Sequence, residues 1–440
     1  MRIGKNSFKG GANVPHYKNT LECKTEAMGI PDKVVIPMLQ HIGAPCNPVV
    51  SKGDTVKLGQ LIGSSESYVS APIHASVSGK VTDISTILTS VGTFVPAVVI
   101  EPDKKQEIHE DVKPPRVTNR EEFLEAVKQS GLVGLGGAGF PTHVKLSVQP
   151  GRKIDYLLIN GAECEPFITS DYREMVENGE GIIEGAKIIM KFLGIPKTII
   201  GVEDNKPEAI SKLTALTRNE KDIDVVRLKS RYPQGGEKVL IYALTGRKVP
   251  SGKLPLDIGV IVINVNSASF INEYIKTGMP LVKKRVTIDG PAVARAANVE
   301  VPIGTQIKDV FDYCGGFKNP PAKIIMGGPM MGVTQYSLEL PVMKQTNAVL
   351  AFDENMAKVM EENPCIRCGR CVNACPMNLL PLTMNALVRN NKIEELGKYH
   401  IMDCMECGSC SFVCPSKRHL VQSFKLGKAR LRAAAAQKKG

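Results

Sequence analysis

The segment CIRCGRCVNACP spans residues 365–376, and CMECGSCSFVCP at residues 404–415 repeats its spacing. In each copy, three cysteines stand three residues apart, and a fourth follows four residues later, directly before a proline. This spacing is typical of two four-iron clusters, because one short loop then supplies three thiolates to one cubane. The proline turns the chain away after the fourth cysteine, since it cannot continue a helix. The repeat therefore predicts an electron-transfer domain.

The fourth cysteine of each copy is expected to bind the other cluster, as is usual for this spacing. The first predicted cluster takes Cys365, Cys368, Cys371 and Cys414, and the second takes Cys404, Cys407, Cys410 and Cys375. A zinc site is the weaker alternative, because zinc usually takes paired CxxC knuckles or mixtures of cysteine and histidine. Disulfides are also disfavoured, because neighbouring thiols in one loop would exchange partners.

The length of 440 residues suggests about three domains of roughly 150 residues each. No run of about 18 apolar residues occurs, so no membrane span is expected. The first residues, MRIGKNSFKGGANVPHYK, lack the apolar core of a secretory signal. Cysteines used as cluster ligands without such a signal indicate a reducing cytoplasm. Four scattered cysteines are expected to be buried or partly buried thiols without a role: Cys23, Cys46, Cys164 and Cys314.

The net charge of +12 is concentrated near the C-terminus, because no acidic residue follows Glu406. The basic residues of this end are Lys417, Arg418, Lys425, Lys428, Arg430, Arg432, Lys438 and Lys439. We expect residues 421–440 to form a basic tail, which docks on anionic lipid or an acidic partner, or keeps the chain soluble. No nucleic-acid recognition motif accompanies this charge.

Short strands separated by turns are expected over residues 31–105, after an irregular arm at residues 1–30. The phrase VSKGDTVKLGQLIG at residues 50–63 resembles the barrel-sandwich hybrid, the small β-domain of lipoyl and biotinyl carriers. Carriers attach their prosthetic group to a lysine at a hairpin tip. The corresponding stretch here, Ser64 to Tyr68, reads SSESY and contains no lysine. This domain is therefore expected to be a structural or docking module.

A parallel α/β sheet is expected over residues 121–278, after a charged, proline-bearing linker at residues 106–120. Apolar strands alternate there with longer amphipathic segments, which is typical of this fold class. The expected strands are 155–161, 197–204, 224–229 and 259–265, and the expected helices are 120–129, 172–193, 207–217 and 267–278. Ligands of such sheets bind at the carboxyl ends of the strands.

Two further domains are expected towards the C-terminus. Residues 281–350 contain KRVTIDGPA and KIIMGG as strands with a helix between them, and they resemble a β-grasp domain of the soluble-ligand-binding (SLBB) type. Residues 351–420 form the two-cluster, ferredoxin-like domain, in which the segment 378–399 between the cysteine runs is expected to be helical. The fold class is thus multidomain α/β and β.

The glycine-rich segment GLVGLGGAGFPT at residues 131–142 is the second informative motif. It does not fit the P-loop pattern, and it does not directly follow a clear strand as a dinucleotide fingerprint should. Its glycines leave backbone amides bare, so they can approach a phosphate closely. The alternative is a flexible loop that binds nothing.

A wider order of motifs gives this loop a context. GGAGFPT is followed by NGAECEP at residues 160–166 and by DYR at residues 171–173. This order resembles the NADH-binding flavoprotein subunit of respiratory complex I, which reads GRGGAGFPTG, NADESEPG and a DR pair. The resemblance implies a Rossmann-like domain with non-covalent FMN at the glycine loop and NAD(H) stacked over it.

The same resemblance implies roles for individual residues. The FMN phosphate and ribityl groups would contact Gly134, Gly136, Gly137, Gly139 and Lys145. The flavin side would contact Asn160 and Glu163, and the nicotinamide nucleotide would contact Phe140 and Glu165. Further motifs of that family correspond to Gly235, Gly236, Glu237, Asn264 and Asn266. The chain departs from the family in three ways. Leu135 replaces an arginine, one of the family's paired glutamates is missing, and the C-terminal region is a two-cluster domain.

Taken together, residues 1 to about 425 resemble the RnfC family of the Rnf electron-transport complexes, in a short form. The resemblance implies ferredoxin:NAD⁺ oxidoreduction coupled to Na⁺ or H⁺ transport, with this chain as the NAD(H) end on the cytoplasmic face. Its partners would be membrane-embedded flavin and ion-transport subunits and a ferredoxin-oxidising subunit. Hydride transfer needs no catalytic acid or base, so His143 is expected to pack or to face solvent.

Three alternatives stay open from the sequence. One is a soluble cobalamin-reductase-like flavoprotein, which shares the flavin, β-grasp and cluster domains. Another is an iron–sulfur electron wire whose glycine loop binds no flavin. The last is a zinc-stabilised scaffold.

Overall fold

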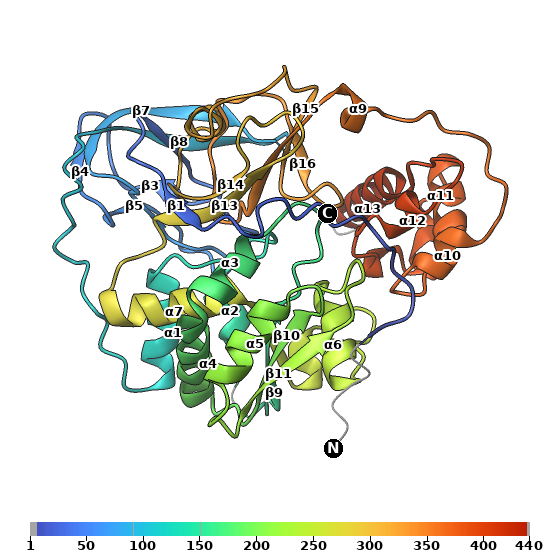
Figure 1. Ribbon diagram of the computed structural model, residues 1–440, viewed down its shortest axis with the longest axis horizontal. Coiled ribbons are helices and arrows are strands. Elements are labelled where there is room, and N and C mark those ends of the chain that lie inside the picture. Colours follow the sequence, from blue (N-terminus) through green and yellow to red (C-terminus); the bar gives the residue numbers. More distant parts are fainter. Residues whose placement is uncertain (1–6, 91, 150, 438–440) are drawn as a thin grey trace.

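The computed structural model describes residues 7–90, 92–149 and 151–437. Figure 1 shows the β-domains on one side of the molecule, the parallel sheet with its helices below them, and the cluster domain beside both. No helix among the described residues combines the length and the apolar character needed to cross a bilayer.

The first domain is a small sandwich of two antiparallel sheets. Their strand orders are β2-β8-β7-β4 and β3-β5-β6. The strands are β2 (Val34–Pro37), β3 (Asn47–Pro48), β4 (Thr55–Val56), β5 (Leu61–Ser64), β6 (Ile73–His74), β7 (Gly79–Leu88) and β8 (Phe94–Pro102). Fully buried Ile36, Ile62 and Ile100 fill the space between the sheets. The expected barrel-sandwich architecture is confirmed.

The second domain is a four-stranded parallel sheet in the order β11-β10-β9-β12. Its strands are β9 (Tyr156–Gly161), β10 (Thr198–Glu203), β11 (Ile223–Leu228) and β12 (Val260–Asn264). Its helices are α1 (Arg120–Gln129), α2 (Thr142–Leu146), α3 (Ser170–Glu177), α4 (Gly179–Leu193), α5 (Pro207–Leu216), α6 (Glu237–Thr245), the 3-10 helix η1 (Pro255–Ile258) and α7 (Val265–Thr277). All four expected strands are confirmed, each within one residue at either end.

Three helical details differ from the expectation, and one is that the short helix α2 was not expected. The segment 172–193 is not one helix, because Asn178 leaves helical geometry (φ −130°, ψ 39°) and separates α3 from α4. Helix α6 has no counterpart among the expected helices. Its residues are buried on most sides, so the segment lacks the one-sided apolar pattern that marks a surface helix.

The third domain is a six-stranded sheet in the order β1-β14-β13-β17-β15-β16. Its elements are β13 (Lys283–Asp289), β14 (Ala297–Pro302), α8 (Ile307–Tyr313), β15 (Lys323–Met326), β16 (Val333–Gln335) and β17 (Ala348–Phe352). The N-terminal arm is not irregular throughout, because β1 (Thr25–Ala27) pairs in parallel with β14. The arm thereby supplies the edge strand of a domain whose other strands come much later in the chain.

The fourth domain is helical and carries both cysteine runs. Its helices are α9 (Glu354–Ala357), α10 (Arg370–Ala374), α11 (Pro381–Arg389), η2 (Glu394–Tyr399), η3 (Ile401–Asp403), α12 (Ser409–Phe412) and α13 (Leu420–Gln437). A long connection leads from α9 to α10 (Figure 1). The segment 378–399 is helical in α11 and η2, as expected.

The basic C-terminal segment is mostly helix α13 rather than a free tail. Leu420, Phe424 and Gly427 lie on one face of α13 and are buried. A Cβ atom on Gly427 would lie 2.7 Å from Cγ2 of Val388, so α13 packs closely on α11. The apolar residues at this helical spacing explain the docking. Lys438 and Lys439 lie outside the described residues.

Candidate functional site

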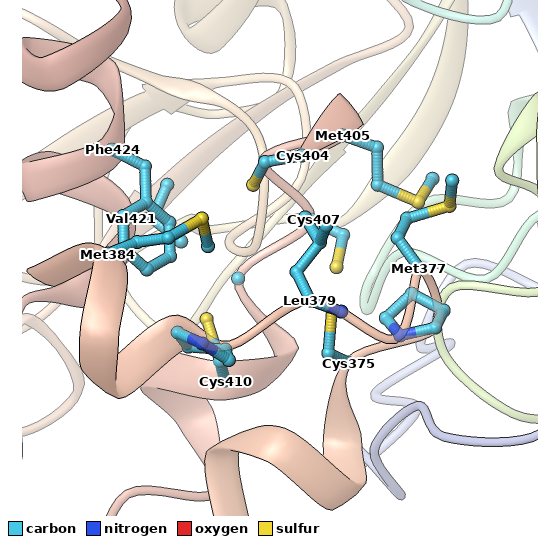
Figure 2. A pocket seen from close by; sticks show the side chains of 13 residues that line it. Cys375, Met377, Leu379, Met384, Cys404, Met405, Cys407, Cys410, Val421 and Phe424 are labelled. Atoms are coloured by element: carbon cyan, nitrogen blue, oxygen red, sulfur yellow. The ribbon is translucent and has the colours of Figure 1, made fainter. Parts of the chain in front are cut away.

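One cavity of the helical domain is lined by four of the predicted cluster ligands. Cys375 comes from the first cysteine run, and Cys404, Cys407 and Cys410 come from the second. Figure 2 shows their sulfur atoms directed towards the same central space, among apolar side chains that include Met384 and Phe424. The structure thus brings together the crossed set of four cysteines that the spacing predicts for the second cluster. We call this cavity the inner cluster site.

The inner cluster site is suited to metal-bound thiolates. The backbone amide of Glu406 donates to Sγ of Cys404 at 3.4 Å, and that of Leu379 donates to Sγ of Cys375 at 3.3 Å. Burial raises the pKa of the Cys404 thiol to about 11 and also raises the pKa of Cys410. The Cys404 and Cys410 thiols therefore favour their protonated forms without metal, so cluster assembly on them releases protons.

The remaining four cysteines form what we call the outer cluster site. Cys365 and Cys368 are exposed, whereas Cys371 and Cys414 are partly buried. Burial raises the pKa of the Cys371 thiol, and the nearby sulfurs of Cys414 and Cys365 contribute to this shift. Residues of both cysteine runs are therefore neighbours here too.

The two runs share a local backbone conformation as well as a spacing. Arg367 (φ 53°) and Glu406 (φ 58°) occupy equivalent positions, and both are in the left-handed region. In each run this turn directs an amide towards the first cysteine, with Arg367 N lying 3.4 Å from Sγ of Cys365. Backbone N–H groups aimed at sulfur stabilise the thiolate form, as iron–sulfur ligation requires.

The glycine-rich loop reverses the chain between Gly134 and Phe140. The amide of Gly134 donates to the Phe140 carbonyl at 2.8 Å, and the amide of Gly139 donates to the Gly134 carbonyl at 3.2 Å. Gly137 has a φ of 109°, and a Cβ atom there would come no closer than 3.8 Å to any neighbour. Gly136, Gly137 and Ala138 are exposed, so the tip of the loop offers bare backbone. This tip fits a phosphate-bearing ligand.

Both ends of the glycine loop are held by other domains. The amide of Ile42, in the barrel-sandwich domain, donates to the Gly139 carbonyl at 3.0 Å. Lys344, in the β-grasp domain, donates to the Gly131 carbonyl at 2.7 Å and to the Pro72 carbonyl at 2.5 Å. The Lys344 side chain is buried, and burial lowers its pKa to about 7. Sequence reasoning missed this residue, because nothing in its local sequence marks it.

Two asparagines lie beside the glycine loop at the end of β12. Asn264 Nδ2 and Asn266 Nδ2 donate to the two carboxylate oxygens of Asp171, at 2.7 and 2.6 Å. A Cβ atom on Gly136 would lie 3.1 Å from Asn264 Nδ2, so the loop and these asparagines are neighbours. Burial raises the pKa of Asp171, and the nearby Lys284 ammonium opposes that shift. Asp171 was not a predicted site residue, although its DYR motif marks it.

Other predicted residues lie at the end of β9 and at the start of α6. Asn160 Nδ2 donates to the Gly235 carbonyl at 2.9 Å, which joins the two segments. Lys145 of α2 forms an ion pair with Glu237 at 2.7 Å. These side chains lie around the carboxyl end of the sheet, where ligands of such sheets bind.

The structure places Glu163 against the first turn of α3. Its carboxylate accepts hydrogen bonds from the amides of Asp171 (2.7 Å) and Tyr172 (3.4 Å), in the first turn of α3. Burial raises the pKa of Glu163 to about 7. The Glu163 carboxylate therefore caps the N-terminal end of α3. Lys18 of the N-terminal arm donates to the carbonyls of Glu163 and Glu165 at 2.9 and 2.8 Å, a support that the sequence does not reveal.

Glu165 lies on the side of the parallel-sheet domain that faces the cluster sites. Its carboxylate accepts from the Met330 amide at 3.0 Å and from the Tyr232 hydroxyl at 3.5 Å. Burial raises the pKa of Glu165 to about 7. Tyr232 in turn packs in an apolar group with Cys407.

The inner cluster site also contacts the parallel-sheet domain directly. Gly236 lies so close to Cε of Met405, which lines the inner cavity, that a Cβ atom on this glycine would overlap it. Lys238 of α6 pairs with Asp403 at 3.3 Å, next to the first ligand of the second run. The inner site therefore lies against the domain that carries the glycine loop.

Comparisons with known proteins agree with this arrangement. Residues 6–105 match the RnfC barrel sandwich hybrid domain, and residues 127–273 match the Nuo51 FMN-binding domain. Residues 285–334 match the SLBB domain, and residues 364–417 match the 4Fe-4S dicluster domain. The predicted cofactor classes, FMN and four-iron clusters, are confirmed at the level of these domains.

Three curated relatives are C subunits of ion-translocating complexes. The one from a proton-translocating ferredoxin:NAD(+) oxidoreductase complex of Clostridium ljungdahlii is 46% identical, over 98% of this chain and 96% of the relative. Its counterpart from a Na(+)-translocating ferredoxin:NAD(+) oxidoreductase complex of Acetobacterium woodii is 44% identical, over 97% of this chain and 98% of the relative. A third, from an ion-translocating oxidoreductase complex of Rhodobacter capsulatus, is 37% identical, over 97% and 83%.

A solved NAD⁺-reducing [NiFe]-hydrogenase in the air-oxidized state has a similar fold. Its TM-score is 0.52 at 17% identity, over 71% of this chain and 66% of that chain. This likeness concerns the fold alone, whereas the curated relatives match nearly the whole chain in sequence. The chain belongs to the RnfC family, the C subunits of ion-translocating oxidoreductase complexes.

Proposed function

We propose that this chain is the NAD(H)-reacting subunit of a membrane-bound, ion-translocating ferredoxin:NAD⁺ oxidoreductase. The names of its relatives, which are 44% and 46% identical, support this assignment. FMN, when bound, exchanges two electrons with NAD(H) and one electron at a time with iron–sulfur clusters. The protein's part is to hold these groups within reach of one another.

We assign the FMN to the exposed tip of the glycine loop and the adjoining strand ends. The backbone of Gly136 and Gly137 would receive the phosphate, since a Cβ atom on Gly137 would have no neighbour closer than 3.8 Å. The ribityl chain and the ring would lie towards Asn160 and Asn264 at the ends of β9 and β12. Gly134, Gly139, Lys145, Gly235, Glu237 and Asn266 complete the proposed surroundings, and Phe140 remains on the nicotinamide side.

We propose roles other than direct FMN contact for Glu163, Glu165 and Gly236. Glu163 orients α3, which carries Asp171, and so acts on the flavin site indirectly. Glu165 and Gly236 lie between the flavin domain and the inner cluster. Electrons would therefore pass between FMN and the inner cluster first, because that cluster contacts the flavin domain.

The outer cluster would then exchange electrons with partner subunits. Its ligands Cys365 and Cys368 are exposed, and Ile366 between them is 69% exposed. An exposed apolar side chain beside an exposed cluster is suited to transient contact with a redox partner. The partners would be the membrane-embedded flavin and ion-transport subunits and the ferredoxin-oxidising subunit, with this chain peripheral on the cytoplasmic face.

The contact between the inner cluster site and the flavin domain is the observation that carries this route. Its test compares Cys375→Ser with Cys414→Ser in the full chain loaded with FMN and iron. Cys375→Ser should lose the EPR signal of the inner cluster, and NADH should no longer reduce the outer one. Cys414→Ser should lose the outer cluster, while NADH still reduces the inner one.

Other outcomes would contradict the proposal at different steps. If Cys375→Ser left NADH reduction of the outer cluster intact, the order of the clusters would be wrong. A wild-type chain without FMN absorbance or NADH-dependent reduction of an artificial acceptor would be an electron wire only. An iron content far below about eight per chain, the amount in two four-iron clusters, would favour a zinc scaffold.

A further inference from the structure

The hairpin tip of the barrel-sandwich domain lies beside the glycine loop. Tyr68 of this tip contacts His143 of α2 edge-on, with ring centroids 6.4 Å apart and planes at 83°. His143 follows closely after Phe140, the end of the glycine loop. The Tyr68 side chain is nevertheless 65% exposed, and Ile42, whose amide holds Gly139, is 54% exposed. Two large, mainly apolar side chains thus stand open next to the loop.

The tip is held rigidly in this position. The amide of Ala44 donates to the Val69 carbonyl at 3.0 Å, and the amide of Ala71 donates to His41 Nε2 at 3.1 Å. Gly43 packs so closely against the Val69 carbonyl that a Cβ atom would overlap the oxygen. A carrier needs a lysine at this tip to bear its prosthetic group, and residues 64–68 contain none. Its open tyrosine therefore suits a fixed binding surface.

The β-grasp domain adds a polar group on the same part of the loop. The side-chain carbons of Gln345 lie within 3.4 to 3.6 Å of a Cβ atom built on Gly139. Gln345 Oε1 is buried and has no hydrogen-bond partner among the described residues. The amide of neighbouring Lys344 donates to Oε1 of Gln40, so the β-grasp and barrel-sandwich loops meet here.

The glycine loop thus separates two surroundings. At Gly136 it faces Asn264 and the strand ends, where we place the flavin. At Gly139 it meets Ile42, Gln345 and the tip that carries Tyr68. A dinucleotide with its nicotinamide on the flavin can reach this second region with its adenosine end by crossing the loop. The second region offers the exposed ring of Tyr68 for a base and the exposed side chain of Ile42 beside it.

We propose that Tyr68 and Ile42 form the platform for the adenine of NAD(H), so that the lipoyl-like domain supplies part of the nucleotide site. This proposal rests on the proposed function. Aromatic side chains bind bases by stacking, and the ring rather than the hydroxyl provides the contact. The barrel-sandwich domain then acts as a static wall of the active site.

The test uses the full chain loaded with FMN and both clusters, with NADH and reduced nicotinamide mononucleotide as alternative donors. Tyr68→Ala should raise the KM for NADH about ten-fold, within the range for loss of one base-stacking contact, with kcat nearly unchanged. The KM for the mononucleotide should stay at the wild-type value, because that donor has no adenosine. Tyr68→Phe should match the wild type with both donors.

Phe94→Ala is the matched control, because Phe94 is an aromatic residue of the same small domain and is 70% exposed. FMN absorbance and iron content report whether each variant is intact. An unchanged KM for NADH in Tyr68→Ala, or an equal rise for both donors, would overturn the Tyr68 proposal alone. A wild-type chain that holds FMN but does not react with NADH would refute the proposed function, and the Tyr68 platform with it.

Discussion

Replacing Lys344 with methionine should change how the stability of this protein depends on pH. Lys344 is fully enclosed at the junction of three domains and donates to the carbonyls of Gly131 and Pro72. Burial lowers its pKa from 10.5 to about 7. His41 and His74 nearby have pKa values lowered to about 4 and about 3, so both stay neutral above pH 7.

The sign follows from the protons bound in each state. Between pH 7 and pH 10.5 the unfolded chain holds a proton on this lysine and the folded chain does not, so folding becomes less favourable as pH falls. Each pH unit is worth about 1.4 kcal/mol, so the wild type should lose about 4 kcal/mol of unfolding free energy from about pH 10 to about pH 7 through this group. Methionine cannot titrate, and that loss should be absent from Lys344→Met.

The two hydrogen bonds of Lys344 stabilise the wild type, so their loss lowers the stability of the variant. The variant leaves two carbonyls without a donor, which should cost about 1–3 kcal/mol for each buried group. Lys344→Met should therefore be less stable than the wild type at about pH 10 and close to it at about pH 7. Urea unfolding of the full chain at several pH values measures this difference, with the exposed Lys80→Met as control. Parallel pH profiles for Lys344→Met and the wild type would refute the reasoning.

Three further predictions concern the flavin site and the cluster domain. Gly137→Val should abolish FMN binding, measured by flavin fluorescence, because the new side chain fills the open tip and the φ of 109° disfavours valine. Iron content should not change. Retained FMN would exclude the glycine loop as the phosphate site. Asp171→Asn should weaken FMN binding about ten-fold, since the carboxylate that accepts from both Asn264 and Asn266 loses one oxygen. Unchanged affinity would show that Asp171 is not needed to position these asparagines. Phe424→Ala should destabilise the cluster domain by about 3–5 kcal/mol and lower iron retention in dilute urea, whereas the exposed Lys425→Ala should behave as the wild type; equal iron loss in both would mean that α13 does not support the clusters.

Much of the architecture follows from local patterns in the sequence. The alternation of apolar strands and amphipathic segments predicts all four strands of the parallel sheet within one residue. Helix α6 escapes this reasoning because packing surrounds it and removes the periodic signal. The N-terminal strand β1 escapes for another reason: its three residues carry too little pattern, and only the distant edge of β14 makes them a strand.

The candidate sites divide in the same way. The cysteine spacing predicts the crossed grouping of Cys375 with the second run, and the cavity of the inner cluster contains that set. The position of a carboxylate in a motif predicts its hydrogen-bond partners less well than cysteine spacing predicts the grouping of thiols. Glu163 lies in the expected loop, yet its oxygens already accept two amides of α3.

The sequence by itself determined the cofactor classes of this protein, because cysteine spacing and bare glycine backbone act over a few residues. Only the tertiary structure decided how these sites are connected. Lys344 reaches Gly131 across 213 residues, and Lys18 reaches Glu163 across 145. The contact of Met405 with Gly236 likewise joins two domains. Such contacts depend on how whole domains pack, and no local sequence pattern predicts the residues that make them. The same packing leaves one cluster site against the flavin domain and the other site with exposed cysteines.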